Sequence, residues 1–273
     1  MRVFVIFCMI YTVYGAKVKP VESKCEGVMI EKKCHKHEVI SNGINRPYHL
    51  SYFNHTVFFS YNAGDDDQDT FEIGYVKFGH KVPIAINLTK NGFAIAIDKL
   101  NKIAYFGGSE GIYEHDLTKP GEIKHIIKKH DIWHMFYKHH LYFIEYPSQR
   151  LHKKVGNDTE LVEHITEKIY QFAIDDHQNT YITTKKGLYE IKNGTTERIL
   201  LKGPKVYRAI VINNKGVPYF CSQSGIYIKE EHTLKEIVHV KNIFGLAFDA
   251  EDNFIYSNPH EIVRLLPEPN KKM

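Results

Sequence analysis

The sequence lacks the signatures of several common protein classes. Its 36 basic and 32 acidic residues leave a formal charge of only +4. Because the two charges nearly cancel, the composition does not indicate nucleic-acid binding, which depends on clustered lysine and arginine. Neither HExxH nor a paired CxxC occurs among the 17 histidines and four cysteines, so no transition-metal site is predicted. No GxSxG phrase, phosphate-cradling glycine loop or Ser/His/Asp arrangement can be picked out, so the sequence offers no catalytic motif.

Long hydrophobic runs are also scarce. One run, Val3 to Val13, follows Met1-Arg2 and precedes the small residues Gly15 and Ala16. This order predicts a secretory signal peptide over residues 1–16, too short to anchor the chain in a bilayer. No other run approaches membrane length. We therefore expect residues 17–273 to form an exported, soluble protein with no membrane contact.

Two further features bear on export. Four N-glycosylation sequons are present, at Asn54, Asn87, Asn157 and Asn193. Cysteine is rare, and loss of Cys8 with the signal peptide leaves an odd number. Cys25 and Cys34 are close in sequence and can bridge in an oxidising compartment. Cys221 lies in an apolar stretch, where a buried thiol is expected.

An internal repeat organises the rest of the chain. The phrases Gly111-Ile112-Tyr113, Gly187-Leu188-Tyr189 and Gly225-Ile226-Tyr227 stand 76 and then 38 residues apart, so one unit without the phrase lies between the first two. In the best copy, short apolar runs at 172–174, 180–183 and 188–191 are separated by turn residues, which predicts three strands and two tight turns. Repeats of this period are typical of propeller blades.

Six such units can be identified. They begin near residues 48, 93, 132, 170, 207 and 244, and each of the first five is followed by a weaker, mixed stretch that suits a solvated outer strand. No long helical period interrupts the alternation of strand and turn, which argues against α/β folds. Six blades of about forty residues use nearly the whole chain. The sequence therefore predicts an all-β, six-bladed β-propeller forming a single domain over residues 17–273.

The ring of blades needs a closure. The last blade shows three strands before Pro267-Glu268-Pro269, which we expect to end it. The segment from Cys25 to Ile40 has alternating β character and is the natural fourth strand. Pairing of this N-terminal strand with the last blade would remove an open sheet edge.

Aromatic residues recur where the innermost strands begin. In a propeller, these ends open on one face of the central channel. The residues at or near these ends are Tyr48, Phe93, Trp133, His134, Tyr170, Tyr207, Arg208 and Phe244. They can line a pocket for a flat, conjugated ligand, or they can simply pack between blades. In the first case, Arg208, His134 and Gln171 can offer charge or hydrogen bonds to carboxylates on the ligand.

Two sets of aspartates need a separate interpretation. The loop from Asp65 to Asp69 resembles a set of hard-cation ligands, but it lacks the pattern of a calcium-binding hand loop, and a solvated hairpin tip is favoured. Asp98, Asp175 and Asp249 occupy equivalent places at the far ends of innermost strands. We expect them to cap tight turns rather than act in catalysis.

The sequence also resembles a known family. The opening Cys25-Glu26-Gly27-Val28, the Pro-Tyr-His-Leu of 47–50 and the repeated Gly-Ile-Tyr phrases are similar to those of the insect ommochrome-binding proteins. The resemblance implies a haemolymph carrier of an ommochrome, a phenoxazinone pigment derived from tryptophan. It assigns no binding residue.

The sequence is therefore compatible with three functions. The favoured hypothesis is a secreted, non-enzymatic and monomeric carrier that binds an aromatic pigment in the channel mouth and needs no other cofactor. The alternative is a metal-dependent hydrolase similar to gluconolactonases, which share the six-bladed architecture and hold a divalent cation in the channel. A propeller that recognises a protein partner is the third hypothesis.

Overall fold

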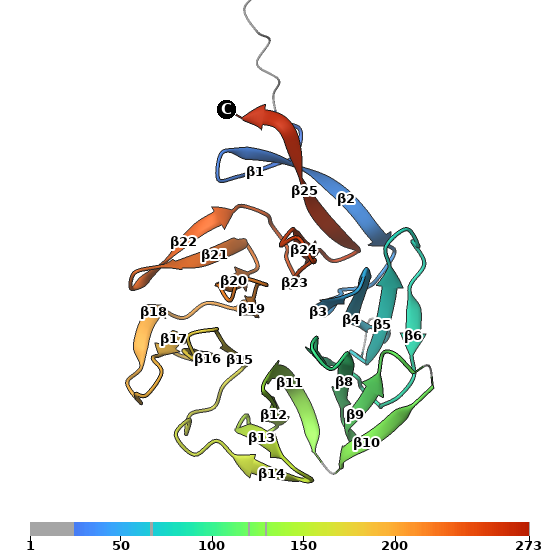
Figure 1. Ribbon diagram of the computed structural model, residues 1–273, viewed down its shortest axis with the longest axis vertical. Helices are drawn as coiled ribbons and strands as arrows, with labels where there is room; N and C mark the ends of the chain where they lie inside the picture. The colour runs from blue at the N-terminus through green and yellow to red at the C-terminus, as the bar shows by residue number, and fades with distance from the viewer. Residues whose placement is uncertain (1–24, 66–67, 120, 129, 273) are drawn as a thin grey trace, which may run out of the picture.

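All regular structure in the described part of the chain is β (Figure 1). The computed structural model describes residues 25–65, 68–119, 121–128 and 130–272. The predicted signal peptide lies outside this range. Within it, the strands form six sheets placed around a central axis (Figure 1). None of the described residues forms a helix long and apolar enough to cross a membrane.

Each sheet runs outward from the axis. The innermost strands are β3 (Tyr48–Phe53), β7 (Ala94–Asp98), β11 (Asp131–Lys138), β15 (Gln171–Ile174), β19 (Tyr207–Ile212) and β23 (Gly245–Phe248). The second strands are β4 (Thr56–Asn62), β8 (Ile103–Gly108), β12 (His140–Tyr146), β16 (Thr180–Thr184), β20 (Pro218–Ser222) and β24 (Phe254–Ser257). Successive strands pair antiparallel, so each blade is built from consecutive hairpins.

The outer half of each blade has the same order. The third strands are β5 (Phe71–Lys77), β9 (Gly111–Asp116), β13 (Leu151–Val155), β17 (Gly187–Ile191), β21 (Gly225–Glu230) and β25 (Glu261–Lys272). The fourth strands of the first five blades are β6 (Ile84–Ile86), β10 (Ile123–Lys128), β14 (Asp158–Leu161), β18 (Ile199–Lys202) and β22 (Thr233–Val238). The predicted six-bladed propeller is therefore confirmed.

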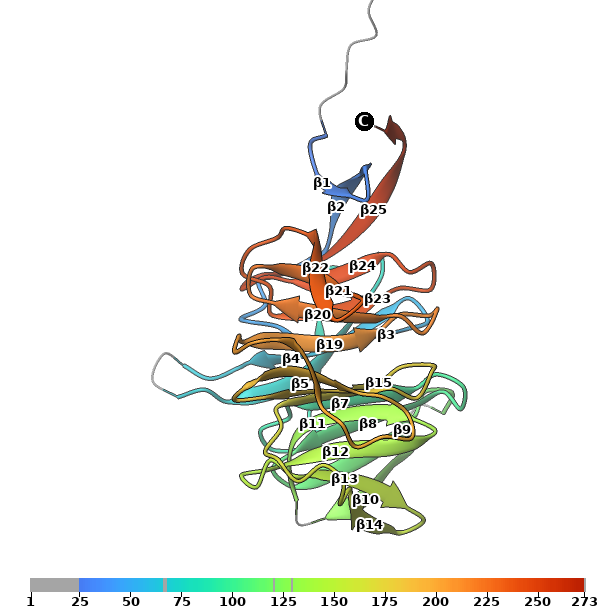
Figure 2. The same ribbon diagram turned by 90° about the vertical axis from the view of Figure 1, so that its left-hand side faces the viewer.

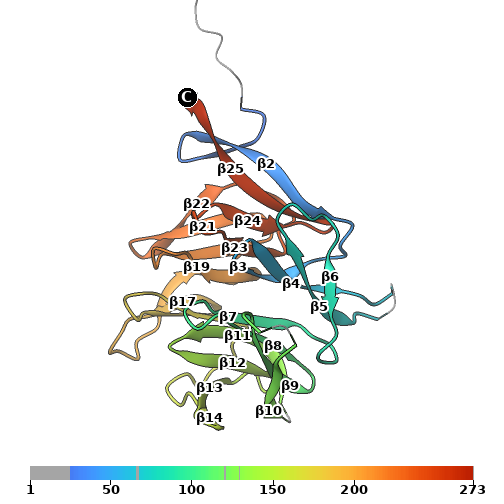
Figure 3. The ribbon, with the colours of Figure 1, turned by 45° about the vertical axis from the view of Figure 1, so that its right-hand side comes forward.

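The N-terminal segment closes the ring. β2 (Lys33–Asn42) pairs with β25 of the last blade, and β1 (Val28–Ile30) adds a fifth strand to the same sheet. Figure 3 shows β2 beside β25, and Figure 2 shows this end of the sheet extending beyond the other blades. Cys25 and Cys34 form a disulfide at its edge, and Cys221 is a buried free thiol. Closure by an N-terminal strand is confirmed.

The prediction that Pro267 and Pro269 end the last blade is wrong. β25 continues through both prolines to Lys272. Its pairing with β2 is irregular at this point, since His35 lies opposite Pro267 while Lys33 lies opposite Lys272. Proline lacks an amide hydrogen and is tolerated where a ladder is interrupted. The strand can therefore pass through both residues.

The structure explains the glycine of the repeated phrase. Gly111 and Gly187 begin third strands with φ of +108° and +143°, a region that favours glycine. A Cβ on Gly111 would lie 2.0 Å from the carbonyl oxygen of Ile127, and one on Gly187 would lie 2.3 Å from that of Lys202. The fourth strand approaches too closely for any side chain at these positions.

Hydrophobic contacts between blades hold the ring together. In the described part of the chain, six clusters of buried side chains each join one blade to the next. Phe58 and Phe106, for example, pack between the first and second blades. Because each blade buries both faces against neighbours, the inner strands read as continuous apolar runs. This packing fixes the inner strands around the axis.

The three recurring aspartates cap turns, as predicted. Asp175 accepts hydrogen bonds from the backbone N–H of Asn179 at 2.8 Å and from its side-chain amide at 3.0 Å. Asp249 does the same with Asn253, at 2.8 and 2.9 Å, and Asp98 accepts bonds from Asn101. Their oxygens stabilise the turns between the first two strands of their blades.

Candidate functional site

A cavity of about 640 Å³ opens where the innermost strands begin; we call it the mouth cavity. Its volume is in the range of small-molecule sites. It is lined by Tyr48, His49, Phe71, Phe93, Trp133, Tyr170, Gln171, Thr183, Thr184, Lys185, Pro204, Lys205, Val206, Tyr207 and Arg208. Six of the eight predicted binding residues therefore lie on one cavity. The two others are His134, which lies deeper in the channel, and Phe244.

Five aromatic rings form a continuous cluster on one side of this face. Phe93 lies at its centre, with ring centroids 4.6 Å from Phe71 and 5.2 Å from Trp133. Tyr48 lies 5.6 Å from Phe93 and 5.1 Å from Phe244, so Phe244 supports the cluster from behind. Such edge-on and tilted contacts are favourable for aromatic pairs. Four of its rings line the mouth cavity: Tyr48, Phe71, Phe93 and Trp133.

The single tryptophan is held in a fixed position. Its indole N–H donates a hydrogen bond to the backbone oxygen of Tyr170 in the next blade, at 3.1 Å. The partner satisfies the only polar atom of a side chain that otherwise packs on apolar groups. Trp133 is the only tryptophan in the sequence, so its fluorescence reports on this cavity alone.

A β-bulge at the channel occurs in every second blade. In β11, Ile132 and His134 pair with consecutive residues of β12, so Trp133 is an extra residue. Arg208 is the extra residue in β19 in the same way. In β3 the pairing skips from Tyr48 to Ser51, and His49 has a φ of +45°. Bulges redirect side chains and are common beside functional sites. Here they aim three side chains at the channel.

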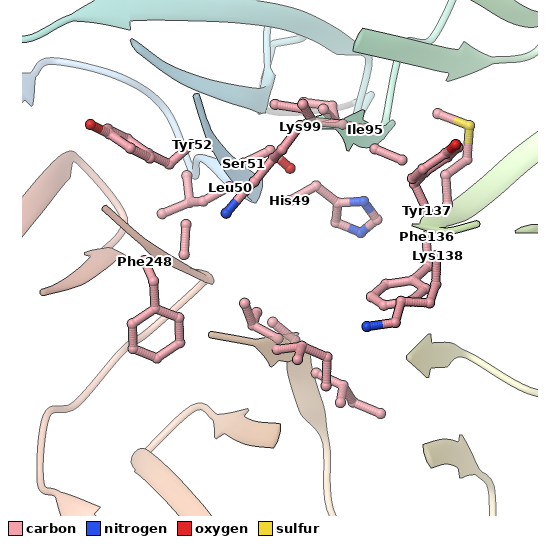
Figure 4. Close-up of a pocket in the computed structure, with 18 of the residues that line it drawn as sticks. His49, Leu50, Ser51, Tyr52, Ile95, Lys99, Phe136, Tyr137, Lys138 and Phe248 are labelled. Carbon is pink, nitrogen blue, oxygen red and sulfur yellow. The ribbon is translucent and has the colours of Figure 1, made fainter. Parts of the chain in front are cut away.

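The channel continues to the opposite face as a second cavity of about 520 Å³, which we call the exit cavity. Figure 4 shows the imidazole of His49 and the ammonium groups of Lys99 and Lys138 pointing into it. His49, Gln171 and Arg208 line both cavities. The ring of His134 lies 5.3 Å from that of His49. We call these four residues, which lie between the two cavities, the waist.

The two histidines of the waist are held in their neutral forms. Burial lowers the pKa of His134 to about 4. Burial and the nearby His134 ring hold the pKa of His49 well below its usual range. Nε2 of His134 lies 3.1 Å from the backbone oxygen of Phe172, which places its proton on that nitrogen. Nδ1 of His134 is buried without a partner.

The depressed pKa of His134 predicts that the folded protein loses stability in acid. Unfolded His134 binds a proton below about pH 6.5, whereas the folded form resists it until about pH 4. The free energy of unfolding should therefore fall as pH drops from about 6.5 to 4, by about 2 kcal/mol for this residue. His134→Gln keeps a donor for the Phe172 oxygen and should make the decrease smaller. Urea unfolding of both proteins at pH 7.5 and 4.5 tests this, and equal decreases would contradict it.

Eight residues that line the mouth cavity were not predicted from the sequence, among them Phe71 and His49. Phe71 starts β5 just after the acidic loop of residues 65–69. That loop joins the second and third strands of its blade, which places it on the mouth face, so the sequence could have predicted the position of Phe71. No local signal predicts the turn of His49 into the channel. Within the loop, Asp69 accepts bonds from Arg46 at 2.7 Å and from Asn62 at 2.6 Å. Among the described residues, no group of three or more acidic, histidine or cysteine side chains could hold a metal ion.

The four predicted glycosylation sites are all exposed. Asn54 and Asn157 lie in turns between strands, and Asn87 and Asn193 follow β6 and β17. An oligosaccharide at any of them would meet solvent. Their use stays a prediction.

This chain can also be compared with known proteins by its sequence. The chain is 29% identical over 269 residues to the ommochrome-binding protein of Manduca sexta, covering 95% of this chain and 98% of the relative. The chain is thus similar to an ommochrome-binding protein over nearly its whole length. The resemblance drawn from the sequence is thus confirmed, and the relative is named as a binding protein rather than an enzyme. No protein-family model matches the chain.

Solved structures share the architecture of this chain. A gluconolactonase from Xanthomonas campestris superposes with a TM-score of 0.69 at 11% identity, covering 92% of this chain and 99% of that one. The WD40 propeller domain of Doa1 gives a TM-score of 0.58 at 10% identity, with 86% and 98% covered. At such low identity these likenesses show the propeller fold alone.

Proposed function

We propose that this protein is a secreted, non-enzymatic haemolymph carrier that binds an ommochrome pigment in the mouth cavity. The observation that carries the proposal is the aromatic cluster around Phe93, which offers flat faces on a cavity large enough for a fused three-ring system. The similarity to an ommochrome-binding protein over nearly the whole chain supports the same ligand. Residues of one chain line this cavity, and we propose that the carrier is monomeric.

A metal-dependent hydrolase is the second candidate, because gluconolactonases share the architecture. Such an enzyme would hold a divalent cation in the channel among carboxylate and amide ligands. Here, Arg208 and two histidines occupy the waist, and the guanidinium would repel a cation. A stoichiometric calcium ion in the purified protein, together with hydrolysis of a lactone, would favour the enzyme over the carrier.

Pigment binding can be observed directly. Adding xanthommatin to the purified protein at micromolar concentration should shift the visible band of the pigment and quench the fluorescence of Trp133. Both effects are expected because the pigment would lie against the indole and exchange water for aromatic faces. A similarly sized aliphatic acid serves as the control and should do neither. If neither signal changes with the pigment, the carrier proposal is wrong.

A further inference from the structure

The waist is polar, whereas the aromatic cluster beside it is apolar. Its four side chains come from the first, third, fourth and fifth blades and are all polar: His49, His134, Gln171 and Arg208. Three of them line both cavities, so a ligand in the mouth cavity meets this layer at its inner end. His134 and Gln171 are buried, whereas His49 and Arg208 are half-buried. Buried polar groups are costly unless they find partners.

Arg208 is the charged member of the layer. No described carboxylate forms an ion pair with it, and its Nε is buried without a hydrogen-bond partner. Its guanidinium lies 5.0 Å from the ring centroid of Phe244, a contact that supports the cation but does not neutralise it. By contrast, Arg264 pairs with Glu38 and Asp249, and Arg198 pairs with Glu167. Arg208 therefore retains both its charge and donors for a planar acceptor.

The two neighbouring histidines can become donors to an anion when they gain a proton. Nδ1 of His134 is buried and unpartnered, and the ring of His49 stands beside it. Burial keeps the pKa of each below its usual value. A nearby negative charge would oppose that shift, so each ring could take up a proton and donate to an anion. Lys99 and Lys138 add positive charge on the exit side, where Lys138 pairs with Asp176 (Figure 4).

The β-bulges indicate that this layer is a built feature. In a regular ladder, Arg208 would pair with a residue of β20. In the bulge it is the extra, unpaired residue, so its side chain leaves the regular alternation of β19. β3 has a similar irregularity at His49, whose φ is +45°, and His49 lines the same two cavities as Arg208. Left-handed backbone at a histidine costs energy, and such strain clusters at ligand sites.

We propose that the waist is an anion site, which takes a carboxylate of a planar aromatic acid while the rings of that acid lie on the aromatic cluster. This inference rests on the proposed carrier function and narrows its ligand class. The Arg208 guanidinium binds the carboxylate through its free donors, and the His134 and His49 imidazoles become donors as they gain protons. The uncharged form of the same ring system would leave Arg208 without a partner.

Two phenoxazinones with the same rings test this. The probes are 2-aminophenoxazin-3-one, which is uncharged, and its 1,9-dicarboxylic acid. Titration by Trp133 quenching should show the acid binding at least about tenfold more tightly, the scale of one charge-assisted bond. Arg208→Gln should bring the two affinities to within about threefold by weakening the acid alone. Arg46→Gln removes an arginine from the same face and should leave the preference unchanged.

A second measurement does not depend on a variant. In the wild-type protein, histidine NMR titration should show the pKa of His134 rising when the dicarboxylic acid is bound and staying low with the uncharged ring. Besides His134, the charged and titratable groups that line the two cavities are His49, Arg208, Lys99, Lys138, His139, Lys185, Lys205, Asp98, Asp176, Tyr48, Tyr52, Tyr137, Tyr170 and Tyr207. Each is present with both probes, so the difference isolates the carboxylates.

The outcomes separate this inference from the function on which it rests. If neither phenoxazinone binds, the carrier proposal fails. If both bind equally to the wild-type protein, or the preference survives Arg208→Gln, or the pKa of His134 does not respond to the acid, the anion site is wrong while the carrier function stands.

Discussion

Phe93→Leu is expected to weaken pigment binding by roughly 30- to 100-fold. Phe93 contacts the rings of Tyr48, Phe71 and Trp133, with centroids 5.6, 4.6 and 5.2 Å away. Leucine fills part of the volume but removes the flat face on which the pigment would lie, and it loosens the neighbouring rings that shape the cavity. The loss should be measured as the dissociation constant for xanthommatin, from its visible absorbance.

A matched substitution separates the site from general effects on the fold. Phe78 is a half-buried phenylalanine outside both cavities, 5.5 Å from the ring of Tyr52 and 4.3 Å from the guanidinium of Arg264. Phe78→Leu should change pigment affinity less than about twofold. Equal effects of the two substitutions would mean that the aromatic cluster is packing rather than a binding surface.

Lys229→Met is expected to destabilise the protein by about 4 kcal/mol. Lys229 on the fifth blade pairs with Glu190 on the fourth, whose side chain is 0% exposed. Glu190 also accepts a hydrogen bond at 3.3 Å from the buried hydroxyl of Tyr181. Without the ammonium group, the carboxylate would be left charged and uncompensated between two blades, which costs much more than the ion pair contributes. Urea denaturation at pH 7 measures the loss.

A double substitution tests the cause of this loss. Glu190→Gln in the Lys229→Met background removes the stranded charge but keeps an acceptor for Tyr181, so most of the stability should return. Lys235→Met is the control, because its pair with Glu230 is more than half exposed on both sides and such pairs contribute about 0.5 kcal/mol. If the double variant is as unstable as Lys229→Met, the buried charge is not the cause.

The face of the propeller that carries the mouth cavity can be predicted from the sequence alone. The innermost strands of a propeller begin on one face, so the sequence predicts that residues at these starts lie together. Six of them line the mouth cavity: Tyr48, Phe93, Trp133, Tyr170, Tyr207 and Arg208. His134 was assigned to the same rim. It lies in the waist instead, because the bulge at Trp133 shifts the register of β11 by one residue.

The sequence also determined most of the fold. Alternating apolar residues and turn residues act locally, so strands and hairpins could be located from them without knowledge of their neighbours. The repeated glycine phrase located the third strands, and the leftover N-terminal segment identified the closure. Tertiary contacts overruled local rules at Pro267, where pairing with β2 carries the strand beyond a residue that usually ends one.

What the sequence by itself determined is therefore the ring of six blades and the aromatic character of one of its faces. Only the tertiary structure decided which polar side chains enter the channel between the two cavities. The physical reason is that a bulge depends on how two strands pair, and a single extra residue moves a side chain from one side of a sheet to the other. His49, Trp133 and Arg208 owe their positions to that pairing.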